Sequence, residues 1–224
     1  RWFNFMICDL FNYRTKQLLI ADHLTVPDIR FKIGSVLIKL LSNVIGISIH
    51  LPSPYTNYVI PPLISTDKIE REYTDKKLII AYSVSGNDFP NTLIDIANYN
   101  PFYKIKYFTN TKINTILPIN IELYEPDEIN FSKYLKQCSA VLCTSGNQLI
   151  LESTYNKIPV AIMPCSKNQF EQVYNIKKYI DILKYAILMN PELDLDLLVK
   201  RNMEEYEVKM INELYNRKEK LLNF

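Results

Sequence analysis

Residues 139–180 alternate apolar runs with polar, helix-forming stretches, and this order constrains the fold more than any other feature of the chain. The run AVLCT leads directly into Ser145-Gly146, where a helix is expected to begin. A second apolar run, IPVAIMP, ends at Pro164 and is followed by a polar loop and a helix at 168–180. Strands that alternate with helices in this way build a parallel sheet, because each helix carries the chain back for the next strand. The sequence therefore predicts an α/β fold.

The same alternation extends through the second half of the chain. The run KKLIIAYSV begins at Lys76 and is almost continuously apolar, as expected for a central parallel strand covered on both faces. Further strands are predicted near 103–109 and 119–123, and the apolar piece YAILM follows the helix at 168–180. Apolar residues recur at helical spacing from 193 to 222, which predicts one long amphipathic helix.

The first part of the chain carries fewer such units. In this part, strands are predicted at 3–9, 17–21, 44–50 and 57–60, and helices at 10–16 and 28–43. The second part has further predicted helices at 91–98 and 130–137. The proline-rich segment LPSPYTNYVIPPL has the composition of a linker. We therefore predict two Rossmann-like parallel-sheet domains, divided into an incomplete N-terminal domain 1–56, a linker 57–75, a second domain 76–192 and a C-terminal helix 193–224. Missing sequence before Arg1 or a partner chain would complete the first domain.

Composition narrows the class of function. The net charge is only +2, from 26 basic and 24 acidic residues, so no global field favours nucleic acid. The 4 cysteines show no CxxC spacing and no nearby histidine, so neither a zinc site nor a disulfide framework is expected. No apolar run approaches the length of a membrane-spanning helix. These features favour a cytoplasmic protein without a bound metal or cofactor, and a peripheral membrane association stays open.

The turn at Ser145, Gly146 and Asn147 is suited to bind a phosphate group. A helix that begins there offers unpaired N–H groups and a partial positive charge. Gly146 lets a ligand come close to the backbone. Glu152 lies seven residues after Ser145, which is about two helical turns and roughly 10 Å along the axis. This distance suits a nucleotide, in which a phosphate and the paired hydroxyls of a ribose must both be bound. A carboxylate accepts hydrogen bonds from such hydroxyls well.

Six positions in this stretch resemble the nucleotide-sugar-binding half of GT-B glycosyltransferases, and the family 28 group in particular. That group includes the bacterial enzyme that forms lipid II and archaeal relatives. The family pattern joins a Ser/His-Gly turn to Glu, two Pro, Gln and Asn at fixed intervals. It falls without a gap on Gly146, Glu152, Pro159, Pro164, Gln172 and Asn175. Several positions in register are a more specific signal than one Gly and one Glu.

The resemblance implies where the substrates bind. The donor would lie mostly on the second domain, in contact with the loop Ser83, Ser85 and Gly86 after the first strand and with Thr144 before the helix turn. Gln169 and Gln172 would bind hydroxyls of the donor sugar, and Glu171 is a weaker candidate for the same region. Asn175 either contacts the sugar or caps local backbone. The acceptor would lie on the first domain, where Asp9 and His23, at strand ends, are weak candidates for the catalytic base.

The family also implies the reaction. It would be transfer of a hexose or N-acetylhexosamine from a nucleotide donor, UDP-linked by resemblance, to an acceptor hydroxyl of a glycan, lipid or small molecule. Inversion at the anomeric carbon and independence of metal are expected. Two alternatives stay open. One is a nucleotide-sugar epimerase of the same architecture. The other is a non-catalytic nucleotide-sugar-binding subunit that needs a partner chain.

Overall fold

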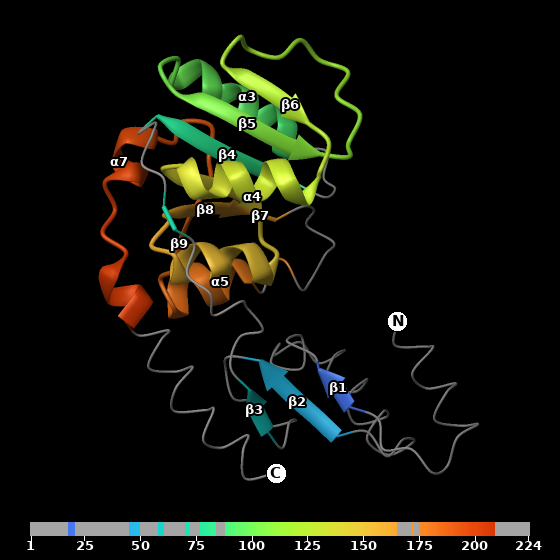
Figure 1. Ribbon diagram of the computed structural model, residues 1–224, viewed down its shortest axis with the longest axis vertical. Coiled ribbons are helices and arrows are strands. Elements are labelled where there is room, and N and C mark those ends of the chain that lie inside the picture. The colour runs from blue at the N-terminus through green and yellow to red at the C-terminus, as the bar shows by residue number, and fades with distance from the viewer. Residues whose placement is uncertain are drawn as a thin grey trace, which may run out of the picture. The chain divides into compact units, whose positions relative to one another are not determined.

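A computed structural model describes residues 18–20, 45–49, 58–60, 70–71, 77–83, 88–164, 172 and 175–208 (Figure 1). The chain folds into two compact units. The first comprises Arg1–Leu63 and Asn212–Phe224, and the second is Ile64–Ile211. Several predicted elements and side chains lie outside the described residues: the strand at 3–9, the helices at 10–16 and 28–43, and Asp9, His23, Ser85, Gly86, Gln169 and Glu171.

The first unit contains a three-stranded parallel sheet in the order β1-β2-β3. Its strands are β1 (Leu18–Ile20), β2 (Ile45–Ile49) and β3 (Tyr58–Ile60). Leu18 pairs with Ile45, and Ile47 pairs with Tyr58. These strands coincide with three of the apolar runs in the first part of the chain, and their parallel pairing agrees with the parallel sheet predicted for this unit.

The second unit is built on a six-stranded parallel sheet in the order β6-β5-β4-β7-β8-β9. Numbered from one within the unit, this order is 3-2-1-4-5-6, that of a doubly wound nucleotide-binding fold. The strands are β4 (Leu78–Ser83), β5 (Lys104–Thr109), β6 (Ile121–Tyr124), β7 (Ala140–Thr144), β8 (Val160–Met163) and β9 (Ala186–Leu188). The helices are α3 (Phe89–Tyr99), α4 (Glu128–Gln137), α5 (Asn147–Tyr155), the π-helix η2 (Lys177–Ile182) and α7 (Leu195–Val199).

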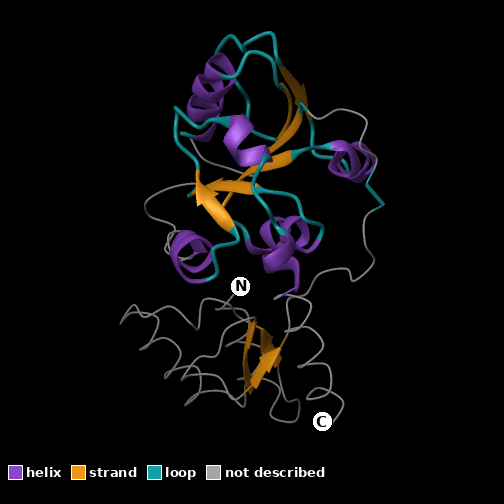
Figure 2. Ribbon diagram, turned by 90° about the vertical axis from the view of Figure 1, so that its left-hand side faces the viewer, coloured by secondary structure: helices purple, strands orange, loops and turns teal. Residues whose placement is uncertain are grey.

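Helices lie on both sides of this sheet (Figure 2). On one face, alternate residues of the central strands pack with α3 and α7 in a single apolar cluster that includes Ile79, Leu93, Ile105, Leu142 and Leu198. On the other face, Tyr82 and Phe108 contact Phe131 of α4 through ring edges, with centroids 5.5 and 5.2 Å apart. Because both faces are covered, the central strands are apolar along almost their whole length, as the sequence predicted.

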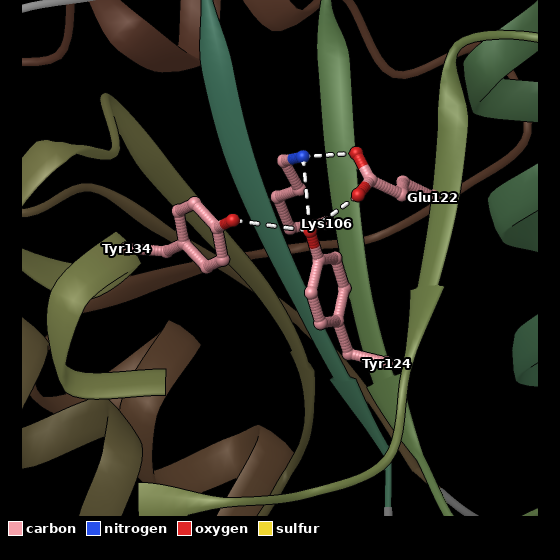
Figure 3. Close-up of polar contacts among 4 residues, drawn as sticks. All are labelled: Lys106, Glu122, Tyr124 and Tyr134. Atoms are coloured by element: carbon pink, nitrogen blue, oxygen red, sulfur yellow. Dashed lines mark hydrogen bonds and ion pairs between the residues drawn. The ribbon is translucent and has the colours of Figure 1, made fainter. Parts of the chain in front are cut away.

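The α4 face also carries one polar cluster, formed by Lys106, Glu122, Tyr124 and Tyr134, whose polar ends point toward one another (Figure 3). The Lys106 ammonium forms an ion pair with Glu122 and lies 3.2 Å from the hydroxyl of Tyr124. It also lies 5.3 and 5.1 Å from the ring centroids of Tyr124 and Tyr134. The hydrogen bond to Lys106 is the main reason that the pKa of Glu122 is lowered. This cluster joins the edge strand β6 to β5 and α4.

The predicted single helix over 193–222 is wrong in its described part. Helix α7 ends at Val199, residues 201–203 are not helical, and a new helical turn covers 204–208. Side-chain hydrogen bonds of Arg201 and Asn202 accompany the break. The Arg201 guanidinium donates to the carbonyls of Tyr185 and Lys184, and the Asn202 side chain accepts from the Glu204 amide at 2.9 Å. Within the described ranges, no helix is both long and apolar enough to cross a bilayer.

Candidate functional site

The strand order places the candidate site between the carboxyl ends of β4 and β7. Chain connections on either side of this pair run in opposite directions across the sheet, and α/β folds bind their ligands at such a switch point. Tyr82 pairs with Cys143, so Ser83 and Thr144 end neighbouring strands at the same edge. Both side chains are buried. The sheet therefore brings together two predicted segments that lie some sixty residues apart in the sequence.

The turn between β7 and α5 leaves the helix N-terminus without a cap. Gly146 is the N-cap residue, with φ −73° and ψ 145°, and because it has no side chain it cannot accept a hydrogen bond from the first turn as a capping residue does. Its own N–H instead bonds the Thr144 carbonyl at 2.7 Å. By contrast, α4 and α7 are capped by the carboxylates of Asp127 and Asp194. The first amides of α5 have no acceptor within the helix, and the N-cap residue supplies none.

Neither its backbone conformation nor its contacts with the described residues explain why position 146 is a glycine. Its φ lies in a region open to every residue type. In the described part of the chain, no atom lies within 4 Å of the place where a Cβ would stand. Among the residues that the structure describes, none fills the space beside the turn.

Glu152 lies on α5, in the second turn after Gly146, and is partly exposed. Its carboxylate Oε1 accepts a hydrogen bond from Gln148 Nε2 at 2.9 Å. Residues four apart share one face of a helix, so Gln148 holds the carboxylate in a defined direction. Sequence reasoning did not single out Gln148, although its spacing of four from Glu152 was visible in the sequence.

Ser145 joins this turn to the segment that begins at Gln172. Its hydroxyl donates to the Gln172 carbonyl at 2.9 Å and lies 3.2 Å from the Gln172 side-chain Oε1. In the other direction, Asn175 Nδ2 donates to the Ser145 carbonyl at 2.7 Å. Ser145 is fully buried, and Asn175 is 1% exposed. The turn and the predicted sugar-binding Gln172 are therefore held next to each other.

At the end of β4, the Ser83 hydroxyl belongs to a buried network. It lies 2.7 Å from the Tyr107 hydroxyl and donates to Thr109 Oγ1 at 3.3 Å. Thr109 Oγ1 also accepts the Thr111 amide at 3.0 Å. Burial is the main cause of a raised pKa for Tyr107. Tyr107 and Thr109 were not anticipated. They fix the strand end that leads into the predicted loop.

The structure thus gathers part of the predicted set. Thr144, Ser145, Gly146 and the backbone of Asn147 form the β7–α5 turn. Gln172 and Asn175 are hydrogen-bonded to this turn, and Glu152 lies further along α5. Cys138 and Cys143 are buried, as expected of small core residues. Among the described residues, no three His, Cys, Asp or Glu side chains gather as metal ligands would.

Comparison with known proteins identifies the family to which this site belongs. The sequence profile described as Glycosyl transferase family 1 matches residues 43–204. Among solved structures, the glycotransferase of kitacinnamycin aligns at a TM-score of 0.58 and 12% identity, over 96% of this chain and 70% of its own. MurG of Acinetobacter baumannii aligns at 0.55 and 11% identity, over 95% of this chain and 61% of its own. These structures are GT-B glycosyltransferases, so the expected fold is confirmed.

A further similar structure was solved with a nucleotide. The spinosyn rhamnosyltransferase SpnG, in complex with thymidine diphosphate, aligns at a TM-score of 0.53 and 12% identity, over 96% of this chain and 73% of its own. At these identities the likeness concerns the fold. This chain spans about three fifths of the length of MurG. A search among curated proteins found no match.

Proposed function

The chain belongs to glycosyl transferase family 1, and we propose that it moves a sugar from a UDP-sugar to an acceptor hydroxyl, with inversion and without a metal ion. The donor sugar would be a hexose or an N-acetylhexosamine. The observation that carries the proposal is the uncapped N-terminus of α5, with Gly146 beside open space at the switch point of the sheet.

The diphosphate would bind at this N-terminus. A phosphate oxygen accepts hydrogen bonds from the first-turn amides and is stabilised by the partial positive charge of the helix. Gly146 permits the close approach, since a Cβ there would point into the space that the ligand needs. Transfer leaves a nucleoside diphosphate with added negative charge. Groups already aimed at that charge lower the barrier for its departure.

The nucleoside would extend along α5. Glu152, held by Gln148, offers a carboxylate about two turns from the phosphate site. Such a group can accept hydrogen bonds from both hydroxyls of a ribose. Gln172, beside the turn, would contact the sugar. One similar structure was solved with thymidine diphosphate. Experiment must therefore decide whether the base of the donor nucleotide is uracil, thymine or a purine.

The test uses binding of nucleotides to the full chain and to the Gly146→Ala variant. We expect calorimetry to detect UDP binding to the wild type, with TDP, GDP and ADP as comparisons. Because a Cβ at Gly146 meets no atom of the described residues, we expect Gly146→Ala to change the free energy of unfolding by less than about 0.5 kcal/mol. We expect at least a tenfold loss of UDP affinity in the same variant.

The outcomes separate clearly. Silence of the wild type toward all four nucleotides at millimolar concentration would remove the proposal. Equal UDP affinity in wild type and Gly146→Ala would show that the phosphate does not lie against this turn. If UDP binds as expected, NMR of the product formed from a UDP-sugar and a panel of acceptors then reports the anomeric configuration.

A further inference from the structure

We infer that Ser145 and Asn175 are positioning residues that lock Gln172 to the β7–α5 turn, so that the two ends of the donor site are held at a fixed separation. The inference rests on the proposed function, because it assigns a role within the same site. Neither side chain would touch the ligand. Their effect would pass through Gln172 and through the first amides of α5.

The first step is the two-way connection. Ser145 donates through its hydroxyl to Gln172 and accepts through its carbonyl from Asn175. One residue of the turn therefore contacts two residues of the later segment, which lie 27 and 30 positions further along the chain. Two hydrogen bonds that share one residue restrain both distance and direction, which a single bond would not do.

The second step is burial. Asn175 is 1% exposed and Ser145 is fully buried, so the bond between them is shielded from solvent. Asn175 resembles the residue that the family pattern places near the donor sugar. In this structure its side-chain nitrogen Nδ2 instead donates a hydrogen bond to the backbone carbonyl of Ser145, with 2.7 Å between nitrogen and oxygen. A buried side chain engaged in this way orders its neighbours.

The third step is an unsatisfied atom. Asn175 Oδ1 is shielded from solvent and has no hydrogen-bond partner among the described residues. A buried polar atom without a partner reduces stability. The position is therefore poorly explained by stability alone. Replacement by alanine would remove this unsatisfied oxygen but would also leave the buried Ser145 carbonyl without its partner, so a moderate loss of stability is expected.

The chain offers a matched control at the other end of α5. Asn156 is also buried, and its Nδ2 donates to the Glu152 carbonyl at 2.8 Å. The two asparagines thus make the same kind of bond at nearly the same distance. Asn156→Ala removes a side-chain amide from the same domain without disturbing the link between Ser145 and Gln172.

The experiment measures the dissociation constants of UDP, UDP-glucose and UDP-N-acetylglucosamine for wild type, Ser145→Ala, Asn175→Ala, the double variant and Asn156→Ala. If Ser145 and Asn175 fix the position of Gln172, a ligand that contacts both the β7–α5 turn and Gln172 depends on them more than a ligand that contacts only the turn. We expect Asn175→Ala to weaken the better-bound UDP-sugar about tenfold and UDP less than about threefold. Because both residues act on one contact, the double variant should be no weaker than the worse single variant. Asn156→Ala should leave both ligands unchanged.

The possible results are distinct. A wild type that binds none of the three ligands overturns the proposed function and the lock together. Two results would overturn the lock alone. In the first, the wild type binds UDP and both UDP-sugars with the same affinity. In the second, Asn175→Ala weakens the affinity for UDP and for the UDP-sugar by the same factor. If Asn175→Ala does not fold, Ser145→Ala, which removes one hydroxyl, decides by the same ratio. Additive losses in the double variant would also contradict the lock.

Discussion

The hydroxyl of Tyr103 donates a hydrogen bond to the carboxylate of Asp196 across 2.6 Å, which joins the start of β5 to α7. The same corner is tied by Asn100, whose side chain donates to the Leu193 carbonyl and accepts the Leu195 amide. Residues more than ninety positions apart therefore meet at one edge of the sheet. The C-terminal segment 193–199 is thus an integral part of the second unit.

We predict that Tyr103→Phe lowers the free energy of unfolding by about 1 kcal/mol, because one bond to a charged but exposed acceptor is lost. Burial, and then Asp196, raises the pKa of Tyr103. Its stabilising effect is therefore complete below the unfolded pKa, near 10, and is lost as the pH rises above it. Urea unfolding at pH 7 and above pH 10 should show wild type and variant converging at the higher pH. A constant difference would contradict this role.

Lys106 provides a second prediction, on the polar cluster of Figure 3. Lys106→Met keeps the apolar stem but loses the contacts to Glu122 and to two tyrosine rings, so we expect a loss of about 1 kcal/mol. Lys133 is the matched control, because it is exposed and lies over the Tyr134 ring at 5.5 Å. Lys133→Met should change stability by less than about 0.5 kcal/mol. Equal unfolding midpoints for the two variants would argue against the cluster.

Two lysines adopt left-handed backbone conformations, with φ 58° at Lys157 and 59° at Lys184. Glycine adopts this conformation without strain, so Lys184→Gly should stabilise the protein by about 0.5–1 kcal/mol. Lys157→Gly should gain less, because it also removes the ion pair with the buried Glu207 at 3.1 Å. Thermal unfolding compares the two directly. A larger gain at Lys157 than at Lys184 would mean that the ion pair adds nothing.

For the ligand site, we predict that Glu152→Ala weakens UDP binding ten- to a hundredfold, as expected for loss of charge-assisted hydrogen bonds worth about 1.5–3 kcal/mol. Gln148→Ala should weaken it less, since Gln148 only orients the carboxylate. Glu128, exposed in the first turn of α4, serves as the control. Calorimetric titration gives all three affinities. A Glu152 variant that binds UDP like the wild type would place the ribose elsewhere.

Much of the fold could be predicted because buried parallel strands are apolar runs, and β4, β7 and β8 coincide with such runs. The edge that carries the site followed from the same reasoning, since Thr144 and Ser83 both end strands. What escaped prediction depends on distant contacts. The bond from Asn175 to Ser145 and the network of Ser83 with Tyr107 need the folded chain. The break after Val199 also escaped, because Leu195, Leu198 and Met203 keep a helical spacing across it.

The connection from β5 to β6 has a practical consequence for studying this protein. It has no helix. Ile113 and Leu117 pack against the core, while Asn114, Thr115 and Ile116 between them are exposed. A fluorophore or affinity tag attached at Thr115 would thus sit on a tether fixed at both ends. Such a probe could report on the tumbling of the protein, or tether it to a surface, while the turn after β7 stays unmodified.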